Sequence, residues 1–343
     1  MMPEGCTIIA HGAEVFDSGD IVRVSNALVP EEFIVAGVMA RTAAEESGFP
    51  CRFNTRPPSR VIRHLPPGTN AWLLNRGKTP ASGEEFGRIV ASRCDQPVYH
   101  IECSSRTVYG WNGTDTRLTE GAARRLGFSA VFRTADVREK KGCIREIRGC
   151  IPGEPVFVNG IIIGSATAET AVLAPENGGF RAVSGITLKQ HGIEKLLRNG
   201  PVDLPRAWCK SGSVRSQTAQ VKERRNPSGR ITVIDHAACD IYARVDTATC
   251  GVVSIGDDTT AVCGHICAHL GIPIFGVTDG DADTVIDHSC CAGSVIVEVT
   301  KGRDDEKGLE IAETVPAAPC HWDHWVTATL RTCRDIRIVR DAR

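Results

Sequence analysis

The sequence predicts an α/β protein that is built mostly from parallel sheets. Short apolar runs of strand length alternate with helix-like segments near both ends of the chain, which is the pattern of βαβ units. The 343 residues include 34 glycines and only 5% aromatic residues, a composition that suits tight turns between strands and helices. This length accommodates two or three domains. We expect an N-terminal open, mostly parallel sheet, a small central antiparallel β unit and a C-terminal parallel sheet.

The first domain is expected over residues 1–110 as a Rossmann-like α/β fold. Functional groups of open α/β sheets lie at the carboxyl ends of the strands. His11 and Gly12, which follow the first strand, are therefore candidate ligand-binding residues. The strands are predicted at residues 6–10, 33–38, 70–75 and 97–102, with helices at 41–47 and 83–93.

Lys78 is a further candidate in this domain, because it follows the third strand and offers a positive charge to an anion. The triplet Gly77-Lys78-Thr79 resembles the end of a P-loop. A P-loop requires a glycine six residues before the lysine, and Trp72 occupies that position. We therefore reject a P-loop and keep Lys78 as an isolated anion-binding candidate.

The middle of the chain changes character twice. Residues 111–150 are polar and then basic, and we expect them to form helices or a connector. Residues 151–205 contain short β-branched runs separated by Asn-Gly, Gly-Gly and Ser-Gly pairs, which are turn and hairpin signals. His191 and Lys195 share a predicted helix in this β-rich unit. They are either ligand-binding residues or part of an exposed polar face.

Residues 206–230 form a predicted basic linker before the last domain. The segment contains seven lysines or arginines and a single acid, Glu223. Two interpretations stay open: a solvated linker, or a strip that contacts phosphate or nucleic acid. The whole chain has a net charge of −1, so its overall charge does not attract nucleic acid.

The last domain, residues 231–343, has the clearest strand and helix pattern. Short connections between its elements predict parallel strands joined by right-handed crossovers. The strands are predicted at residues 230–235, 251–256, 272–278 and 294–300, with helices at 239–247 and 259–270.

Carboxylates follow three of these strands. Because parallel neighbours end at the same edge of a sheet, we expect the acids to gather there. Oxygen ligands of this kind suit Mg²⁺ or Mn²⁺, whereas a plain polar turn is the structural alternative. The candidate metal ligands are Asp235 and Asp240 after the first strand, and Asp279, Asp281 and Asp283 after the third.

The second strand ends in Gly256-Asp257-Asp258-Thr259-Thr260, which opens a predicted helix. Asp and Thr at this position are typical helix caps. A helix N-terminus also offers N–H groups to a phosphate, although Asp257 and Asp258 would repel an anion unless a cation bridges them. Both a simple cap and a shared metal–phosphate site stay open.

The order strand–acid, strand–acid, strand–DxD resembles the toprim domain of primases, topoisomerases and some nucleases. The resemblance implies that Asp279 and Asp281 hold Mg²⁺ as the DxD pair, and that Asp235 stands near the metal-binding glutamate of that family. This chain has Asp235 instead of a glutamate, and His236 follows it where the family has a glycine. Those departures weaken the expectation of strand-cleaving chemistry.

A resemblance to one family extends over nearly the whole chain. It is carried by HGAEVFDSG (11–19), LLNRGKT (73–79), PGEPVFVNGIIIG (152–164), KQHGIEKL (189–196), GDDTT (256–260) and GVTDGDAD (276–283). The chain is similar to an uncharacterised family of methanogenic archaea, a domain of unknown function with a toprim-like part. This resemblance implies no activity, substrate or catalytic residue.

The fifteen cysteines do not form a recognisable motif. Their number is odd and no CxxC occurs, so we expect small buried thiols in a reducing cytoplasm and no iron–sulfur cluster. Neither a targeting signal nor an apolar run long enough to span a bilayer is visible, which predicts a cytoplasmic protein without a membrane partner.

The leading functional hypothesis is a Mg²⁺-dependent enzyme of phosphoryl transfer or phosphate-ester cleavage. Its expected partner is a nucleotide or another phosphorylated small molecule, and nucleic acid is the less favoured partner. One alternative is a toprim-type nucleic-acid-processing protein. Another is a non-enzymatic protein that binds or assembles a metal or cofactor. The sequence identifies neither a nucleophile or general base nor an oligomeric state.

Overall fold

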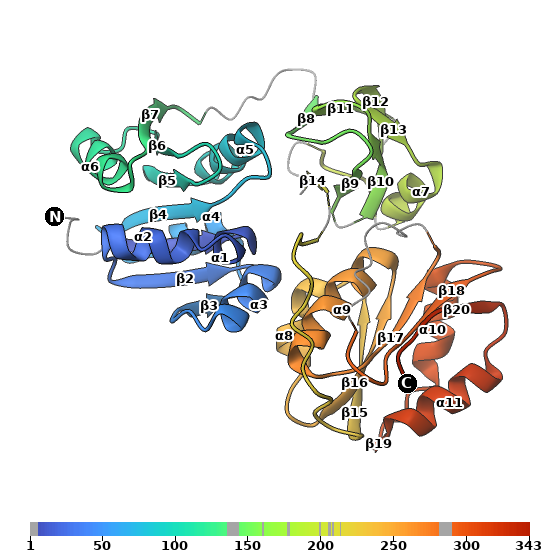
Figure 1. Cartoon of the computed structure of the whole chain (residues 1–343). Helices are drawn as coiled ribbons and strands as arrows, with labels where there is room; N and C mark the ends of the chain where they lie inside the picture. Colours follow the sequence, from blue (N-terminus) through green and yellow to red (C-terminus); the bar gives the residue numbers. More distant parts are fainter. Residues whose placement is uncertain are drawn as a thin grey trace. The chain divides into compact units, whose positions relative to one another are not determined.

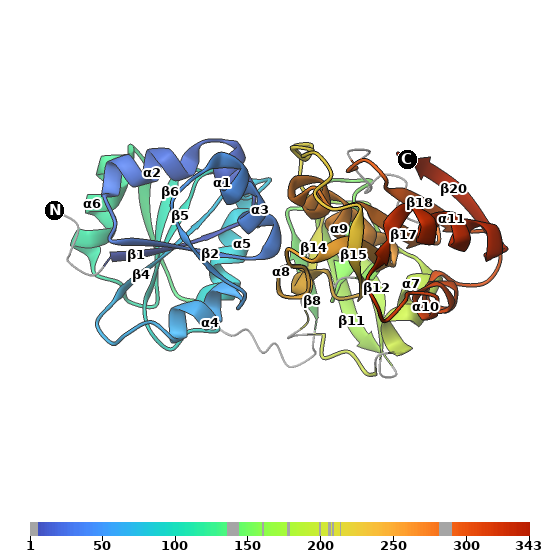
Figure 2. The same cartoon turned by 90° about the horizontal axis from the view of Figure 1, so that it is seen from below.

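The computed structural model describes residues 6–135, 144–159, 161–176, 179–198, 200–204, 207, 209–212, 214–280 and 290–343. The chain divides into two compact units, Met1–Gly212 and Ser213–Arg343. Each unit is described separately below, and their elements are labelled in Figure 1 and in a second view in Figure 2.

The first unit contains a seven-stranded sheet in the order β3-β2-β1-β4-β5-β6-β7 (Figure 1). All neighbouring strands are parallel except β5 and β6, so the expected open, mostly parallel sheet is confirmed. The strands are β1 (Cys6–His11), β2 (Glu32–Ala36), β3 (Arg52–Asn54), β4 (Asn70–Asn75), β5 (Val98–Glu102), β6 (Thr107–Trp111) and β7 (Ser129–Arg133).

Helices cover both faces of this sheet, which explains why consecutive residues of β1 are apolar. Ile8 and Ile9 point to opposite faces and both are fully buried. The helices are α1 (Glu14–Asp17), α2 (Asp20–Leu28), α3 (Val38–Ser47), α4 (Pro58–Arg63), α5 (Pro80–Ala91) and α6 (Thr116–Leu126). Residues of α1, α2, α3 and α6 pack in the core on one face, and residues of α4 and α5 on the other.

The first part of residues 111–150 contains a helix, one of the two alternatives expected there, but it is not a separate connector, because α6 and β7 complete the first sheet. The Asp115 side chain caps α6 by accepting a hydrogen bond from the Leu118 N–H at 3.1 Å. The buried face of α6 includes Ala122 and Leu126, while Arg124 and Arg125 are exposed. That narrow apolar stripe makes the segment look polar in the sequence.

The remainder of the first unit consists of two small antiparallel sheets and one helix. The antiparallel prediction is confirmed, although the strands begin before residue 151 and continue beyond residue 205. The two sheets have the orders β13-β10-β9-β14 and β12-β11-β8. Their elements are β8 (Arg145–Arg148), β9 (Pro155–Val158), β10 (Ile161–Ala166), β11 (Thr170–Glu176), β12 (Gly179–Ser184), β13 (Ile186–Leu188), α7 (Gln190–Arg198) and β14 (Cys209–Ser211).

The second unit contains a six-stranded sheet in the order β19-β15-β16-β17-β18-β20 (Figure 1). The four strands β15 to β18 are parallel, as expected, and the two edge strands are antiparallel to their neighbours. The strands are β15 (Ser228–Asp235), β16 (Thr249–Ile255), β17 (Ile274–Thr278), β18 (Val295–Val299), β19 (Cys320–His321) and β20 (Ile336–Asp341).

Long helices lie on both faces of the second sheet. α9 (Asp257–Leu270) packs on β16 and β17. The Thr260 side chain lies so close to Gly276 of β17 that a Cβ at residue 276 would be 2.5 Å from its methyl group. α10 (Asp304–Glu313) and α11 (Trp322–Thr332) share the core on the other face, with Ile311 and Trp322 fully buried. Among the described residues, no helix of either unit combines the length and apolarity needed to span a membrane.

The helix predicted at residues 239–247 is wrong in its extent. The structure has one 3₁₀ turn, η1 (Ala238–Asp240), and the single-turn helix α8 (Ile241–Arg244). The chain becomes extended at Val245, and the Asp246 side chain then accepts hydrogen bonds from the Ala248 N–H and the Thr249 hydroxyl. This aspartate forms a local turn in place of another helical turn.

The basic segment is not a free linker in its second half. The Lys222 and Arg225 N–H groups donate to the carbonyls of Ala268 and Gly271 at the end of α9. Arg224 forms an ion pair with Asp323 at 2.7 Å, and Arg230 forms one with Asp246 at 2.9 Å. These side chains are therefore engaged within the second unit, and β15 already begins at Ser228.

Candidate functional site

Three carboxylates meet at the edge of the second sheet where its parallel strands end. Asp257 begins α9 directly after β16, Asp279 follows β17, and Asp304 begins α10 after β18. One oxygen of each carboxylate lies within 4.8 Å of the corresponding oxygens of the other two. The convergence follows from the parallel topology, which places the ends of β16, β17 and β18 at one edge.

Two of these carboxylates are buried. Asp304 is 0% exposed and Asp257 is 7% exposed. The Asp279 N–H donates to Asp257 Oδ1 at 3.3 Å, and the Asp305 N–H donates to Asp304 Oδ1 at 3.0 Å. Negative charges at this separation repel one another, and a bound cation would compensate them. The all-oxygen donor set fits Mg²⁺ or Mn²⁺.

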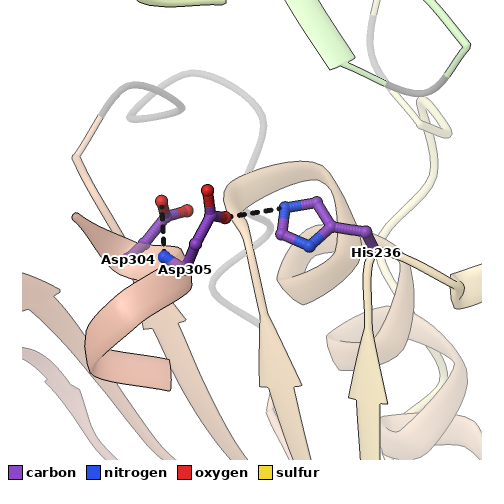
Figure 3. A group of neighbouring side chains, drawn as sticks. All are labelled: His236, Asp304 and Asp305. Atoms are coloured by element: carbon purple, nitrogen blue, oxygen red, sulfur yellow. Dashed lines mark hydrogen bonds and ion pairs between the residues drawn. The ribbon is translucent and has the colours of Figure 1, made fainter. Parts of the chain in front are cut away.

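A histidine that directly follows β15 lies at the same edge. His236 Nε2 lies 3.3 Å from Asp305 Oδ1, and its other ring nitrogen, Nδ1, lies 2.5 Å from Asp235 Oδ1. Figure 3 shows the Asp305 carboxylate facing this imidazole from the first turn of α10, beside Asp304. His236, Asp304 and Asp305 also have ligand atoms within 4.8 Å of one another.

Gly256 leaves room for this imidazole. A Cβ atom added at residue 256 would lie 2.8 Å from His236 Nε2, closer than real Cβ atoms approach. Gly256 also has a φ of +98°, a conformation that residues with side chains rarely adopt. The glycine after β16 thus serves both the turn into α9 and the position of the histidine.

The predicted metal ligands have different positions in the structure. Asp279 belongs to the cluster, and Asp235 contacts it through His236. Asp240 lies in η1, is exposed and pairs with Arg244 at 3.6 Å, outside both groups of potential ligands. Asp281 and Asp283 lie outside the described residues.

The predicted phosphate-binding residues at the start of α9 also divide into two sets. Gly256, Asp257 and Asp258 form the turn and the first residues of the helix. Thr259 and Thr260 are buried, and the Thr260 hydroxyl shares a 3.0 Å hydrogen bond with the Ser254 hydroxyl of β16. Thr260 therefore helps to attach α9 to the sheet and does not face a ligand.

The candidates in the first unit are engaged in its own structure. His11 Nδ1 lies 2.8 Å from the Ala36 carbonyl oxygen, and its ring stacks on Phe86. Burial lowers the pKa of His11, which disfavours its charged form. Gly12 follows β1 with a φ of +87°.

Lys78 forms an ion pair with Glu154 and donates to the Ser211 hydroxyl at 2.7 Å, so its charge is compensated within the unit. His191 and Lys195 are half-buried on α7, which packs against β10. Gly192 permits that contact, because a Cβ there would lie 2.0 Å from the Ile162 carbonyl oxygen.

The described cysteines are thiols, and all except Cys239 are buried or half-buried. Burial raises the pKa of Cys6 to about 12 and that of Cys94 to about 11, which disfavours the thiolate that binds metals. Within the described part of the chain, the two groups that could hold a metal ion contain no cysteine.

Sequence reasoning missed His236, Asp304 and Asp305 as members of the site. The signal was present, since Gly302-Arg303-Asp304-Asp305 follows the predicted strand at residues 294–300. Functional residues follow the strands of parallel sheets, so the strand at residues 294–300 points to Asp304 and Asp305 in the same way as the three strands before it. His236 was noticed only as a departure from the toprim pattern.

Comparison with known proteins identifies relatives without a described activity. Residues 8–318 match the family described as "Uncharacterized protein conserved in archaea (DUF2117)". The "Uncharacterized protein MJ0065" of Methanocaldococcus jannaschii is 31% identical over 324 residues, which cover 88% of each chain. No solved structure matches the chain. The extent of the match from the first sheet to beyond α10 shows that the chain belongs to this archaeal family.

Proposed function

We propose that the second unit binds Mg²⁺ or Mn²⁺ through Asp257, Asp279 and Asp304, and that it transfers or hydrolyses a phosphoryl group. The observation that carries this proposal is the convergence of these three carboxylates from successive strand ends. Two of them are buried, and a bound cation would reduce the repulsion among the three carboxylates. The proposed substrate is a nucleotide or another phosphorylated small molecule.

The start of α9 supports a phosphate ligand beside the cation. Its first N–H groups lie at the same strand edge, where the positive end of the helix dipole favours an anion. Asp257 and Asp258 carry negative charge at this position, so the phosphate would be bound together with the cation rather than alone. When bound, the cation would stabilise negative charge on the phosphoryl oxygens.

The second half of the basic segment favours a small ligand over a nucleic acid, because two of its arginines lie far from the acidic edge. Arg224 and Arg230 are paired with Asp323 and Asp246, both at the amino ends of the strands. The acids lie at the opposite, carboxyl ends, after an eight-residue β15. A strand of that length spans about 26 Å, which exceeds the Debye length of about 8 Å at physiological salt. A toprim-type role would require nucleic-acid binding despite this separation.

A thermal-shift experiment tests the metal site. Mn²⁺ or Mg²⁺ should raise the melting temperature of the wild-type chain, because a ligand that binds only the folded state stabilises it. The variant Asp257→Asn/Asp279→Asn should lose this shift. Asp240→Asn is the matched control, since Asp240 also follows β15 but lies outside both ligand groups. An equal metal-induced shift in the double variant and in the wild type would refute the assignment.

The same assay, repeated with nucleotides and phosphorylated metabolites, identifies the substrate class. A ligand of the proposed kind should add stability only when the metal is present, and phosphate release should then be measurable. Submicromolar binding of DNA or RNA at about 150 mM salt would instead support the toprim-type role.

A further inference from the structure

We propose that this edge binds two cations that share Asp304, and that the second cation is a transition metal held by His236, Asp304 and Asp305. The inference deepens the proposed function, on which it rests, by giving the site a second ion with a different metal preference. The preferred probe is Mn²⁺, which accepts both oxygen and nitrogen ligands.

Asp304 belongs to two groups of potential ligands. Asp257, Asp279 and Asp304 form one group, and His236, Asp304 and Asp305 form the other. A carboxylate has two oxygen atoms and can therefore bridge two cations. Asp304 is suited to this role because it begins α10 and is fully buried between the two groups.

The group of His236, Asp304 and Asp305 is not purely acidic, because it includes an imidazole. His236 directly follows β15, whereas Asp304 and Asp305 lie at the start of α10. Figure 3 shows the ring reaching toward the carboxylates from its own strand. An imidazole nitrogen is a borderline-soft ligand that suits manganese, iron, zinc and related metals better than it suits Mg²⁺.

Two residues outside this group orient the His236 imidazole toward Asp304 and Asp305. Asp235 Oδ1 lies 2.5 Å from His236 Nδ1, so the other ring nitrogen, Nε2, is the one that faces Asp304 and Asp305. A carboxylate on the far nitrogen of a metal-binding histidine fixes the orientation of the ring and raises its basicity. Gly256 supplies the space, because any Cβ there would contact Nε2 at 2.8 Å.

A pair of cations that share a carboxylate also fits the proposed chemistry. Two metal ions about 3.5–4 Å apart stabilise both the attacking and the leaving oxygen of a phosphoryl displacement. In this chain, the first group would lie beside the start of α9 and the second beside the end of β15. The two ions would thus contact a phosphate from neighbouring strand ends.

The test is the number of Mn²⁺ ions bound by the purified full-length chain. Calorimetric titration and metal analysis should find two equivalents in the wild type and one in His236→Ala. Electron paramagnetic resonance should show a spin-coupled manganese pair in the wild type and an isolated ion in the variant. His191→Ala, a half-buried histidine of α7, is the control and should retain two equivalents.

Two further variants make the test independent of the folding of His236→Ala. Asp305→Asn should also lose only the second ion. Asp235→Asn should weaken the second ion by about 10- to 100-fold and leave the first unchanged, because it removes only the support of the imidazole. Asp304→Asn should weaken both ions.

The outcomes separate the two proposals. One Mn²⁺ equivalent in the wild type, unchanged in His236→Ala and Asp305→Asn, would overturn the second ion while the first site stands. In that case His236 serves only as an ion-pair partner of Asp235 and Asp305. No bound metal in the wild type would refute the proposed function and this inference together. Two equivalents that persist in both variants would place the second ion elsewhere and also overturn the inference.

Discussion

The two large sheets treat buried acids in opposite ways. In the first unit, Glu102 is fully buried at the end of β5 and accepts hydrogen bonds from Gly77, Ser104 and Ser105. In the second unit, the buried Asp304 and Asp257 lie within 4.8 Å of each other and of Asp279. The difference teaches that burial alone does not mark a functional acid. The informative feature is whether further acids lie beside it.

Asp20 extends the same pattern in the first unit. This buried acid accepts hydrogen bonds from Arg76 Nε at 2.5 Å and from the Ser18 hydroxyl at 2.8 Å. A cation in the chain itself therefore compensates its charge. The first sheet thus uses its buried acids to fix loops, whereas the second gathers three carboxylates at one edge, where a bound cation would reduce their mutual repulsion.

The largest expected effect concerns Glu102. Replacing it with alanine should destabilise the first unit by about 4 kcal/mol, because several half-buried donors lose their buried acceptor at once. Peptide-resolved hydrogen exchange measures this loss separately for the two units. Glu120→Ala, an exposed acid of α6, is the control and should change stability by less than about 0.5 kcal/mol. A similarly small change in Glu102→Ala would remove the structural role assigned to this acid.

The next effect is a pH dependence of the first unit. His100 is fully buried, with Nε2 on the Asn75 side-chain oxygen and Nδ1 near the Trp111 N–H, and burial lowers its pKa to about 3. The folded state therefore disfavours the charged imidazole. The contribution of neutral His100 to the free energy of unfolding is fully present above 6.5, the pKa of this histidine in the unfolded chain. It is lost as the pH falls toward 3, because the unfolded chain binds the proton more readily.

As the pH falls from 6.5 to 5, the low pKa of His100 should reduce the free energy of unfolding of the first unit by about 2 kcal/mol. The variant His100→Gln should show a correspondingly flatter pH profile in urea unfolding followed by hydrogen exchange. If the wild type and the variant lose stability in parallel over this range, His100 is not the group responsible.

The smallest expected effect is an increase in the stability of the second unit. In the absence of metal, Asp257→Asn should stabilise this unit by about 1 kcal/mol, because it removes repulsion while the amide oxygen still accepts from the Asp279 N–H. Thermal unfolding in the presence of a chelator measures the change. A loss of stability comparable to that of Glu102→Ala would show that the two edges do not differ as described.

Local patterns in the sequence predicted much of this architecture. Apolar runs located most strands of both large sheets, and short connections predicted that β15, β16 and β17 are parallel. The strand-end rule then placed Asp257 and Asp279 at one edge. These features depend on neighbouring residues and on general rules of topology, so a single sequence contains them.

The remaining features depend on contacts between distant residues. Lys78 looked available for an anion, but its partner Glu154 lies 76 positions away. Thr260 looked like a helix cap facing a phosphate, but the direction of its hydroxyl depends on how α9 packs on Ser254. The position of His236 depends on Gly256, which follows the neighbouring strand β16. Such pairings arise only when the sheets form.

The antiparallel strand β20 has a consequence for the solubility of the second unit. Without it, the parallel strand β18 would expose a row of unpaired backbone groups, to which the sheet of another molecule could add. β20 pairs with β18 and becomes the edge strand of the sheet. Its sequence, Ile-Arg-Ile-Val-Arg-Asp, gives this new edge charged side chains. Arg337 is additionally fixed to Glu298 of β18 at 2.6 Å. The last strand thus protects the sheet against edge-to-edge aggregation.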